Sequence, residues 1–209
     1  MSKIIRSTLF MFVITLVFTS LVTYVKIVNE DRINTNREIK LQKTILKVLG
    51  IKVNEDISPD KIMEIFKKRI TSETIGDRTI YVCRDENGIE ITGYAFPVKG
   101  PGFWGPVYAM AAVNRDADKL SGVSFYRHSE TPGLGGRISE NWFSGQFEGL
   151  FLKLPEGEKN YFTLTPEGDG KPENELDAIT GASRTSEAVE TFLNRELKTV
   201  IEQIKSKRR

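Results

Sequence analysis

The fold is decided by the stretch Ile80-Tyr81-Val82-Cys83-Arg84-Asp85-Glu86-Asn87-Gly88-Ile89-Glu90-Ile91-Thr92-Gly93-Tyr94-Ala95-Phe96. Two runs rich in β-branched and aromatic residues flank a polar segment that ends in Asn87-Gly88. Asn-Gly between two such runs is a strong short-range signal for a β-hairpin. The stretch therefore predicts two neighbouring antiparallel strands.

A second pair of strands and several helices extend this pattern. Residues 107–113 and 120–126 are again β-rich, a polar turn joins them, and residues 161–164 predict one more strand. Apolar residues at helical spacing predict further helices. These cover residues 29–50, residues from Ser58 to Ile70, residues 139–151 and a long final helix that carries its apolar face from Val189 onward. The predicted fold class is α+β, an antiparallel sheet with surrounding helices.

The N-terminal stretch Ser7–Val25 contains no charged residue and lies between Arg6 and Lys26. At about 1.5 Å per residue, a helix of this length just crosses a hydrocarbon core of about 30 Å. A cleaved signal peptide is the alternative, but the apolar run is longer than a typical signal core and no small-x-small cleavage site follows it. We therefore expect one transmembrane helix within an N-terminal anchor, residues 1–28.

The charges around this segment favour one orientation. Lys3, Arg6 and the amino terminus place the N-terminus in the cytoplasm, since positive flanks stay on that side. We therefore expect a single-pass protein of the cell inner (cytoplasmic) membrane with its soluble domain, residues 29–209, on the extracytoplasmic side. The first part of that domain, residues 29–75, is predicted to be helical and membrane-proximal.

Composition excludes several functions. The net charge is +2 and the basic residues are scattered, which argues against nucleic acid as a partner. One cysteine and one histidine allow neither an intramolecular disulfide nor a metal site of the usual zinc type, so we predict no metal. No nucleophile-elbow motif is present, and we assign no catalytic residue. No Gly-x-Gly-x-x-Gly fingerprint follows a predicted strand, so we expect no NADH site.

The stretch Asp177-Ala178-Ile179-Thr180-Gly181-Ala182-Ser183-Arg184-Thr185-Ser186 places an acidic residue and four hydroxyls at the start of the last predicted helix. A helix N-terminus offers unpaired N–H groups and a positive dipole end, which favour an anion such as phosphate. An ordinary helix cap explains Ser and Thr at this place equally well. From the residues alone, both interpretations stay open.

Three segments, taken together, resemble a known family. Asp-x-x-Thr-Gly-Ala-Ser-x-Thr resembles the flavinylation motif of FMN-binding domains, in which a flavin transferase esterifies the phosphate of FMN onto a hydroxyl. Residues 99–105 resemble the glycine-tryptophan loop of that family, and residues 128–136 its Glu-Thr-Pro-Gly-Leu-Gly loop. With the membrane segment, the chain is similar to the family of FMN-binding subunits formed by NqrC, of the Na+-translocating NADH:quinone reductase, and RnfG, of the Rnf complex. It lies closer to the NqrC branch.

The resemblance implies a covalent FMN on Ser183, with Thr185 as the alternative attachment site because the family more often has Thr at the esterified position. It implies that the transferase recognises Asp177, that Thr180 and Thr185 hold phosphate oxygens, and that the two loops contact the flavin ring. The cofactor-binding positions it assigns are Asp177, Thr180, Gly181, Ala182, Ser183, Thr185, Trp104, Glu130, Thr131, Gly133, Leu134 and Gly135.

The function that the resemblance implies is that of an electron-relay subunit in a membrane-bound, ion-translocating NADH:quinone oxidoreductase. Such a subunit exchanges electrons with other subunits of the complex and has no NADH site of its own. Three alternatives remain open at this point: the RnfG component of an Rnf-type ferredoxin:NAD oxidoreductase, a stand-alone extracytoplasmic FMN-domain reductase, and an anchored module that has lost its flavin.

Overall fold

The computed structural model describes residues 3–54, 57–76, 78–154, 157, 159–168, 172 and 174–207. The chain divides into two compact units, Met1–Leu41 and Gln42–Arg209. Helix α1, Lys3–Val48, runs through the boundary between them. The predicted apolar helix and the predicted charged helix that follows it are therefore one continuous helix.

The first unit consists of the N-terminal part of α1. Within the described chain, this is the one helix that is long and apolar enough to cross a membrane, judged by length and composition. Its apolar window has no residue buried against the rest of the chain.

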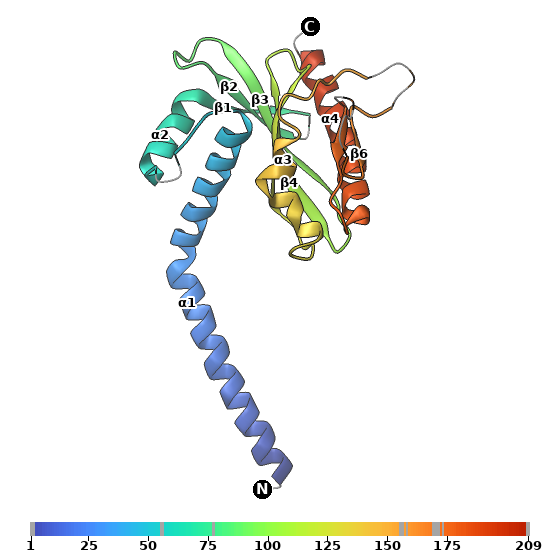
Figure 1. The fold of residues 1–209 in the computed structure, drawn as a ribbon. Helices are drawn as coiled ribbons and strands as arrows, with labels where there is room; N and C mark the ends of the chain where they lie inside the picture. Colours follow the sequence, from blue (N-terminus) through green and yellow to red (C-terminus); the bar gives the residue numbers. More distant parts are fainter. Residues whose placement is uncertain are drawn as a thin grey trace. The chain divides into compact units, whose positions relative to one another are not determined.

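The second unit is built on a five-stranded antiparallel sheet in the order β1-β2-β3-β4-β5 (Figure 1). Its strands are β1 (Ile70–Ile75), β2 (Arg78–Arg84), β3 (Ile91–Pro101), β4 (Pro106–Asn114) and β5 (Leu120–Arg127). Each strand pairs with the next one along the chain. The predicted α+β class and both predicted strand pairs are confirmed.

One prediction was wrong at the start of this sheet. Residues 29–75 were predicted to be helical, but helix α2, Pro59–Arg69, ends where Ile70 adopts an extended backbone. Residues Ile70–Ile75 then form β1, which pairs with β2 from Ile70 opposite Cys83 to Ile75 opposite Arg78. Thr and Ile dominate this segment, and such β-branched residues suit a strand that has a partner.

Two further predictions need correction after β5. The helix predicted over 139–151 is much shorter in the structure, where α3 (Asn141–Gly145) follows a 3₁₀ turn, η1 (Gly135–Ser139). Its aromatic residues Phe143 and Phe147 are buried as the spacing indicated, because they pack edge to face. The strand predicted over 161–164 is β6 (Thr163–Thr165), and it pairs in parallel with β7 (Glu175–Asp177), which was not predicted. The sequence also predicts a turn-rich loop over 166–172, of which residues 169–171 lie outside the described residues.

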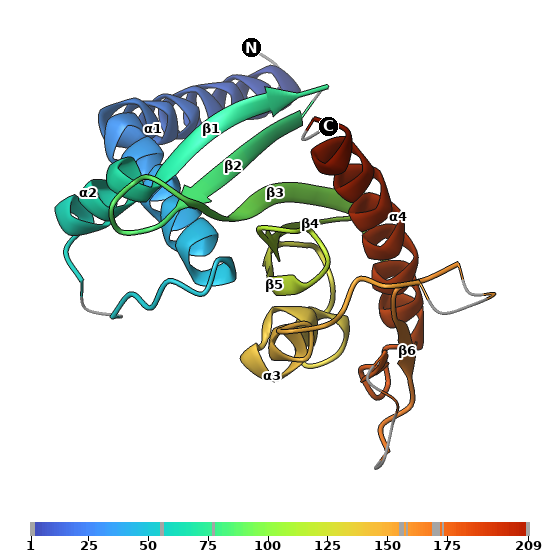
Figure 2. The same cartoon turned by 90° about the horizontal axis from the view of Figure 1, so that it is seen from above.

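The long helix α4, Ser183–Lys207, covers one face of the sheet and packs most closely on β3 (Figure 2). Its apolar stripe is buried, as the helical spacing predicted; the stripe consists of Val189, Phe192, Leu193, Leu197, Val200, Ile201 and Ile204. At Gly100 of β3 the side chain of Phe192 lies directly against the strand, since a Cβ there would lie 2.1 Å from Cγ of Phe192.

The end of α1 covers the other face of the sheet. Successive residues of a strand point to opposite faces. On β5, Val123 belongs to the core cluster under α4, whereas a Cβ at the neighbouring Gly122 would lie 3.0 Å from the carbonyl oxygen of Val48. The sheet is therefore a middle layer between α4 and the end of α1.

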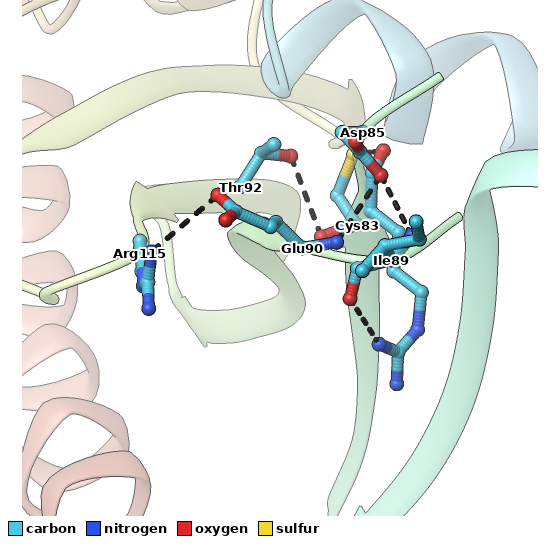
Figure 3. A network of polar contacts seen from close by, with 7 residues as sticks. Cys83, Asp85, Ile89, Glu90, Thr92 and Arg115 are labelled. Carbon is cyan, nitrogen blue, oxygen red and sulfur yellow. Dashed lines mark hydrogen bonds and ion pairs between the residues drawn. The ribbon is translucent and has the colours of Figure 1, made fainter. Parts of the chain in front are cut away.

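The predicted Asn-Gly hairpin connects β2 and β3 by a polar turn (Figure 3). Asp85 organises it, because its Oδ1 accepts hydrogen bonds from the N–H groups of Ile89 (2.7 Å) and Glu90 (3.2 Å). Glu90 also forms an exposed ion pair with Arg115 of the β4–β5 turn, with 3.7 Å between the charged atoms. These two turns lie at the same end of the sheet.

Candidate functional site

The opposite end of the sheet carries the two predicted flavin loops. Residues 102–105 connect β3 to β4, since Pro101 pairs with Pro106. The chain leaves β5 at the same end, because Tyr108 of β4 pairs with Arg127. The Glu-Thr-Pro-Gly-Leu-Gly loop begins directly after that residue. The antiparallel topology therefore places the two loops next to each other.

The second loop contains the turn that its sequence predicts. The N–H group of Leu134 donates to the carbonyl oxygen of Thr131 at 3.2 Å, and Gly133 has a φ of +75°. A proline followed by a residue with positive φ is the arrangement of a type II turn. Thr131, Gly133 and Leu134 are all exposed, so this turn presents its residues to solvent.

The attachment motif connects β7 to α4. Asp177 is the last residue of β7, and the side chain of Gln146 holds its backbone on both sides. The N–H group of Asp177 donates to Oε1 of Gln146 at 2.6 Å, and Nε2 of Gln146 donates back to the carbonyl oxygen of Asp177 at 3.2 Å. No local spacing connects these two residues along the chain, so the sequence carries no signal for the role of Gln146.

Ser183 is the first residue of α4, as the sequence predicted for the hydroxyl-rich stretch. Its side chain is exposed, and the preceding Thr180 and Gly181 are exposed as well. Ala182 is buried beneath them. The hydroxyl of Ser183 is therefore accessible from solvent at the positive end of a long helix dipole.

Thr185 has a different environment, although it lies in the same helical turn. Its residue is 3% exposed, and its hydroxyl donates a hydrogen bond of 2.6 Å to Oε2 of Glu130. Ser186 is also buried, where its Oγ accepts from the N–H group of Ile179 at 3.0 Å and donates to the carbonyl oxygen of Ala182. In this turn the hydroxyl of Ser183 is thus exposed, whereas those of Thr185 and Ser186 are buried and make hydrogen bonds within the domain.

Glu130 connects the three segments of the site. It is 5% exposed, and its Oε1 accepts a hydrogen bond of 3.1 Å from the backbone N–H of Trp104 in the β3–β4 loop. Its Oε2 accepts from Thr185 of α4. Its own N–H donates to Nδ1 of His128 at 3.2 Å. A single carboxylate therefore contacts both loops and the first turn of α4.

Two glycines provide the room for this carboxylate. A Cβ at Gly102 would lie 2.5 Å from Oε1 of Glu130. A Cβ at Gly135 would lie 2.7 Å from Oε2 of Glu130 and 2.5 Å from Oγ1 of Thr185. Distances this short are excluded by sterics, so any larger residue at either position would displace the carboxylate.

The surface above this buried group is apolar. Phe103 is 50% exposed and Trp104 67% exposed, and their rings pack edge to face with 4.9 Å between centroids. Leu134 is exposed too, and its side chain reaches the backbone of Gly181. The guanidinium group of Arg184 lies over the ring of Phe103 at 5.8 Å. Exposed apolar side chains that gather in this way mark a surface for a ligand or a partner.

The hairpin tip formed by residues 99–106 surrounds an open hollow of about 580 Å³. A second cavity of about 630 Å³ lies between the end of α1, β5 and α3. None of the residues that the motifs assign to the cofactor lines the second cavity. The candidate site is therefore the group of motif residues at the loop end of the sheet, and the larger cavity is not part of it.

Part of the chain matches a known family of domains. Residues 102–198 match the family model of the FMN-binding domain, a range that contains residues 102–105 of the first loop, the whole second loop, the attachment motif and most of α4. This part of the chain is therefore similar to FMN-binding domains, the class that its motifs predicted.

Among curated proteins, the chain is similar to several NqrC subunits of Na(+)-translocating NADH-quinone reductases. It is 35% identical over 109 residues to that of Vibrio campbellii, covering 50% of this chain and 40% of that protein. It is 34% identical over 125 residues to that of Chlamydia muridarum, covering 52% and 39%. The match to Yersinia pestis is 30% over 115 residues, covering 55% and 43%. The chain thus spans less than half the length of these relatives.

Two solved structures share the fold. The NqrC of the Na(+)-translocating NADH-quinone reductase from Parabacteroides distasonis superposes with a TM-score of 0.67 at 22% identity, covering 82% of this chain and 94% of that chain. The NqrC of Shewanella oneidensis gives 0.66 at 19% identity, covering 80% and 97%. The likeness in fold therefore covers about four fifths of the chain, whereas the sequence matches cover about half of it.

Proposed function

We propose that this chain is an electron-relay subunit that carries FMN in a phosphoester bond to Ser183. The observation that supports this attachment site is the contrast within the first turn of α4. The hydroxyl of Ser183 is exposed, whereas that of Thr185 is buried and hydrogen-bonded to Glu130. A modifying enzyme can reach the first hydroxyl without unfolding the helix.

The ester replaces the O–H bond of Ser183 by an O–P bond. The transferase must therefore supply FMN in an activated form, as part of a dinucleotide, whose other half leaves with the proton. Asp177 is the acidic residue of the motif that the transferase recognises in this proposal. The positive end of the α4 dipole and the guanidinium of Arg184 then lie close to the phosphate charge.

The apolar surface fits the other end of the cofactor. Leu134, Phe103 and Trp104 are exposed near the attachment segment, and a flat aromatic ring system covers side chains of this kind. Thr131 is exposed in the same turn and offers a hydroxyl at the edge of this surface. FMN, when bound, supplies one- and two-electron redox chemistry, while the residues of the chain hold and orient it.

The N-terminal half of α1 anchors the protein in the membrane in this proposal, with the FMN-binding domain on the extracytoplasmic side. The curated relatives are named as subunits of a Na(+)-translocating NADH-quinone reductase, which supports a complex of the same type here. The other subunits of that complex are then the electron donors and acceptors, and a flavin transferase matures the chain. A covalent bond keeps the flavin attached where the cell cannot replace it.

The attachment is tested by producing the full-length protein together with a competent flavin transferase. The expected result is a fluorescent band on a denaturing gel and a mass increase for FMN, both lost in Ser183→Ala. Ser183→Thr keeps a hydroxyl and is expected to keep the band. A band that survives in Ser183→Ala but is absent in Thr185→Ala would move the attachment to Thr185. The complete absence of flavin from the wild-type protein would contradict the proposal.

The side of the membrane is tested separately. Protease added to intact spheroplasts is expected to digest the domain after residue 28 and to leave it intact when added to inverted vesicles. The opposite pattern would place the flavin in the cytoplasm and contradict the proposed orientation, whatever the result of the attachment experiment.

A further inference from the structure

The buried carboxylate of Glu130 is the most unusual group in the described chain. Burial of a carboxylate is unfavourable unless hydrogen bonds or charges compensate it. In the part of the chain that the structure describes, no Lys or Arg pairs with Glu130. Its compensation comes from the N–H of Trp104, the hydroxyl of Thr185 and the positive end of α4. A costly group of this kind calls for an explanation at this particular place.

The two hydrogen bonds of the Glu130 carboxylate, to Trp104 and to Thr185, give this explanation. Thr185 lies two positions after Ser183 in the same helical turn, so a bond that fixes Thr185 also fixes where Ser183 points. Trp104 carries the exposed indole of the β3–β4 loop, and its backbone N–H is held by the other oxygen of the same carboxylate. The carboxylate therefore sets the spacing between the attachment point and the apolar loop surface.

We propose that Glu130 is the positioning residue of the attachment site, and that it assembles the two loops and the first turn of α4 before FMN is bound. This inference rests on the proposed function, because it presumes attachment at Ser183. Glu130 does not react. It holds Thr185 inside the domain, leaves Ser183 as the exposed hydroxyl of the turn, and places a negative charge beneath the apolar surface on which the flavin lies.

Two features of the site support this role. Gly102 and Gly135 have no side chain where one would touch the carboxylate, at 2.5 Å and 2.7 Å respectively. Glu130 and Thr185 are both almost completely buried, which strengthens a hydrogen bond by excluding water. Loops held in advance also lower the conformational cost of binding a ligand.

The chain contains a matched control. Glu196, on helix α4, is also a buried glutamate, and it pairs with Arg78 of β2 at 2.5 Å. Glu196 contacts neither loop of the site. Glu130→Gln and Glu196→Gln both remove one buried negative charge of the domain, so a difference between them reports the position of the charge and not the general cost of losing it.

The test uses the full-length protein in detergent and measures three quantities for each variant. These are the thermal midpoint of unfolding, the rate at which a flavin transferase produces the fluorescent band, and the midpoint potential of the attached flavin. Glu130→Gln is expected to slow attachment by about tenfold, the effect of weakening one buried hydrogen bond to a charged group. It is also expected to raise the flavin potential, because a negative charge no longer opposes reduction. Glu196→Gln is expected to change only the thermal midpoint.

Thr185→Val and Thr185→Ser make the test independent of the folding of Glu130→Gln. Thr185→Val removes the hydroxyl and keeps the carboxylate, so attachment is expected to slow while the potential shifts less than in Glu130→Gln; Thr185→Ser is expected to recover the lost rate. Wild-type rates and potentials in Thr185→Val and Glu130→Gln would overturn the inference, as would an equal slowing by Glu196→Gln. A wild-type protein without flavin would instead refute the proposed function itself.

Discussion

The two ends of strand β3 are organised in opposite ways. Before the strand, the turn of residues 85–90 keeps its carboxylates at the surface, where Glu90 pairs with Arg115 in solvent (Figure 3). After the strand, the aromatic side chains of Phe103 and Trp104 are at the surface and the nearest carboxylate, Glu130, is inside. The same strand therefore connects an ordinary surface turn with a loop that reverses the usual positions of polar and apolar groups.

This difference teaches which end of the sheet was shaped by something other than folding. A surface turn gains stability by exposing its charges, and the turn at residues 85–90 does so. The loop end accepts two unfavourable features, an exposed apolar surface and a buried charge. Both become understandable if a flat cofactor covers the surface. Variants made in parallel at the two ends can break or sharpen this comparison.

The largest difference is expected between two glycine substitutions. Gly135→Ala would place a Cβ 2.7 Å from Glu130 and 2.5 Å from Thr185, so we expect a loss of about 1–3 kcal/mol in the free energy of unfolding and loss of flavin attachment. Gly88→Ala in the turn has a φ of +73° and no atom within 4 Å of the new Cβ, so we expect a loss of about 1 kcal/mol and unchanged flavin content. Denaturant unfolding and flavin absorbance measure both. Full flavin content in Gly135→Ala would show that the carboxylate tolerates displacement.

A smaller difference is expected between two exposed apolar residues. Trp104 and Ile89 are both largely exposed, so each change to Ala is expected to alter the free energy of unfolding by less than about 0.5 kcal/mol. Trp104→Ala is expected to change the absorption and fluorescence of the attached flavin, because the indole belongs to the surface that the ring covers. Ile89→Ala is expected to leave both spectra unchanged. Identical spectra for the two variants would remove Trp104 from the site.

The smallest effect is expected from pH at the turn. The N–H of Ile89 lowers the pKa of Asp85 below its ordinary value of 3.8, with a further contribution from the N–H of Glu90. A carboxyl whose pKa is lowered by folding contributes stability above its unfolded pKa, and this contribution is lost as the pH falls through the folded pKa. The wild-type protein is therefore expected to lose some stability between about pH 5 and pH 2 as Asp85 becomes protonated. Asp85→Asn has no carboxyl at this position, so it is expected to lose slightly less stability over this range, without any change in flavin content. Titration by NMR checks the direction, and an Asp85 pKa above the ordinary value would contradict it.

Much of the fold follows from local patterns of sequence. The Asn87-Gly88 turn and the apolar spacing of α4 are local signals, and the structure confirms both. The strand Ile70–Ile75 was missed because its neighbours up to Arg69 are helical and its strand character depends on pairing with β2. The parallel pair β6–β7 was missed for a related reason, since strands of only three residues carry too little pattern to recognise.

The sequence predicts the members of the candidate site, but not their contacts. The motifs predicted a cofactor role for Glu130 and Thr185, and the structure brings the two residues together although they lie 55 positions apart along the chain. The sequence suggested that Thr185 binds phosphate, but in the structure its hydroxyl is bonded to Glu130, and its role toward FMN stays a prediction. Contacts between residues so far apart in sequence depend on the tertiary fold, as do the hydrogen bonds between Gln146 and Asp177. No local spacing in the sequence predicts them.

The close approach at Gly100 carries a lesson about how such chains can diverge. The missing side chain in β3 is dictated by Phe192 on the helix across from it, and not by any need of the strand. A homologue with a bulkier residue in place of Gly100 can keep this packing only if a smaller ring or an aliphatic side chain replaces Phe192. Positions 100 and 192 are thus expected to covary among homologues, and this covariation would reflect the spacing between helix α4 and the sheet.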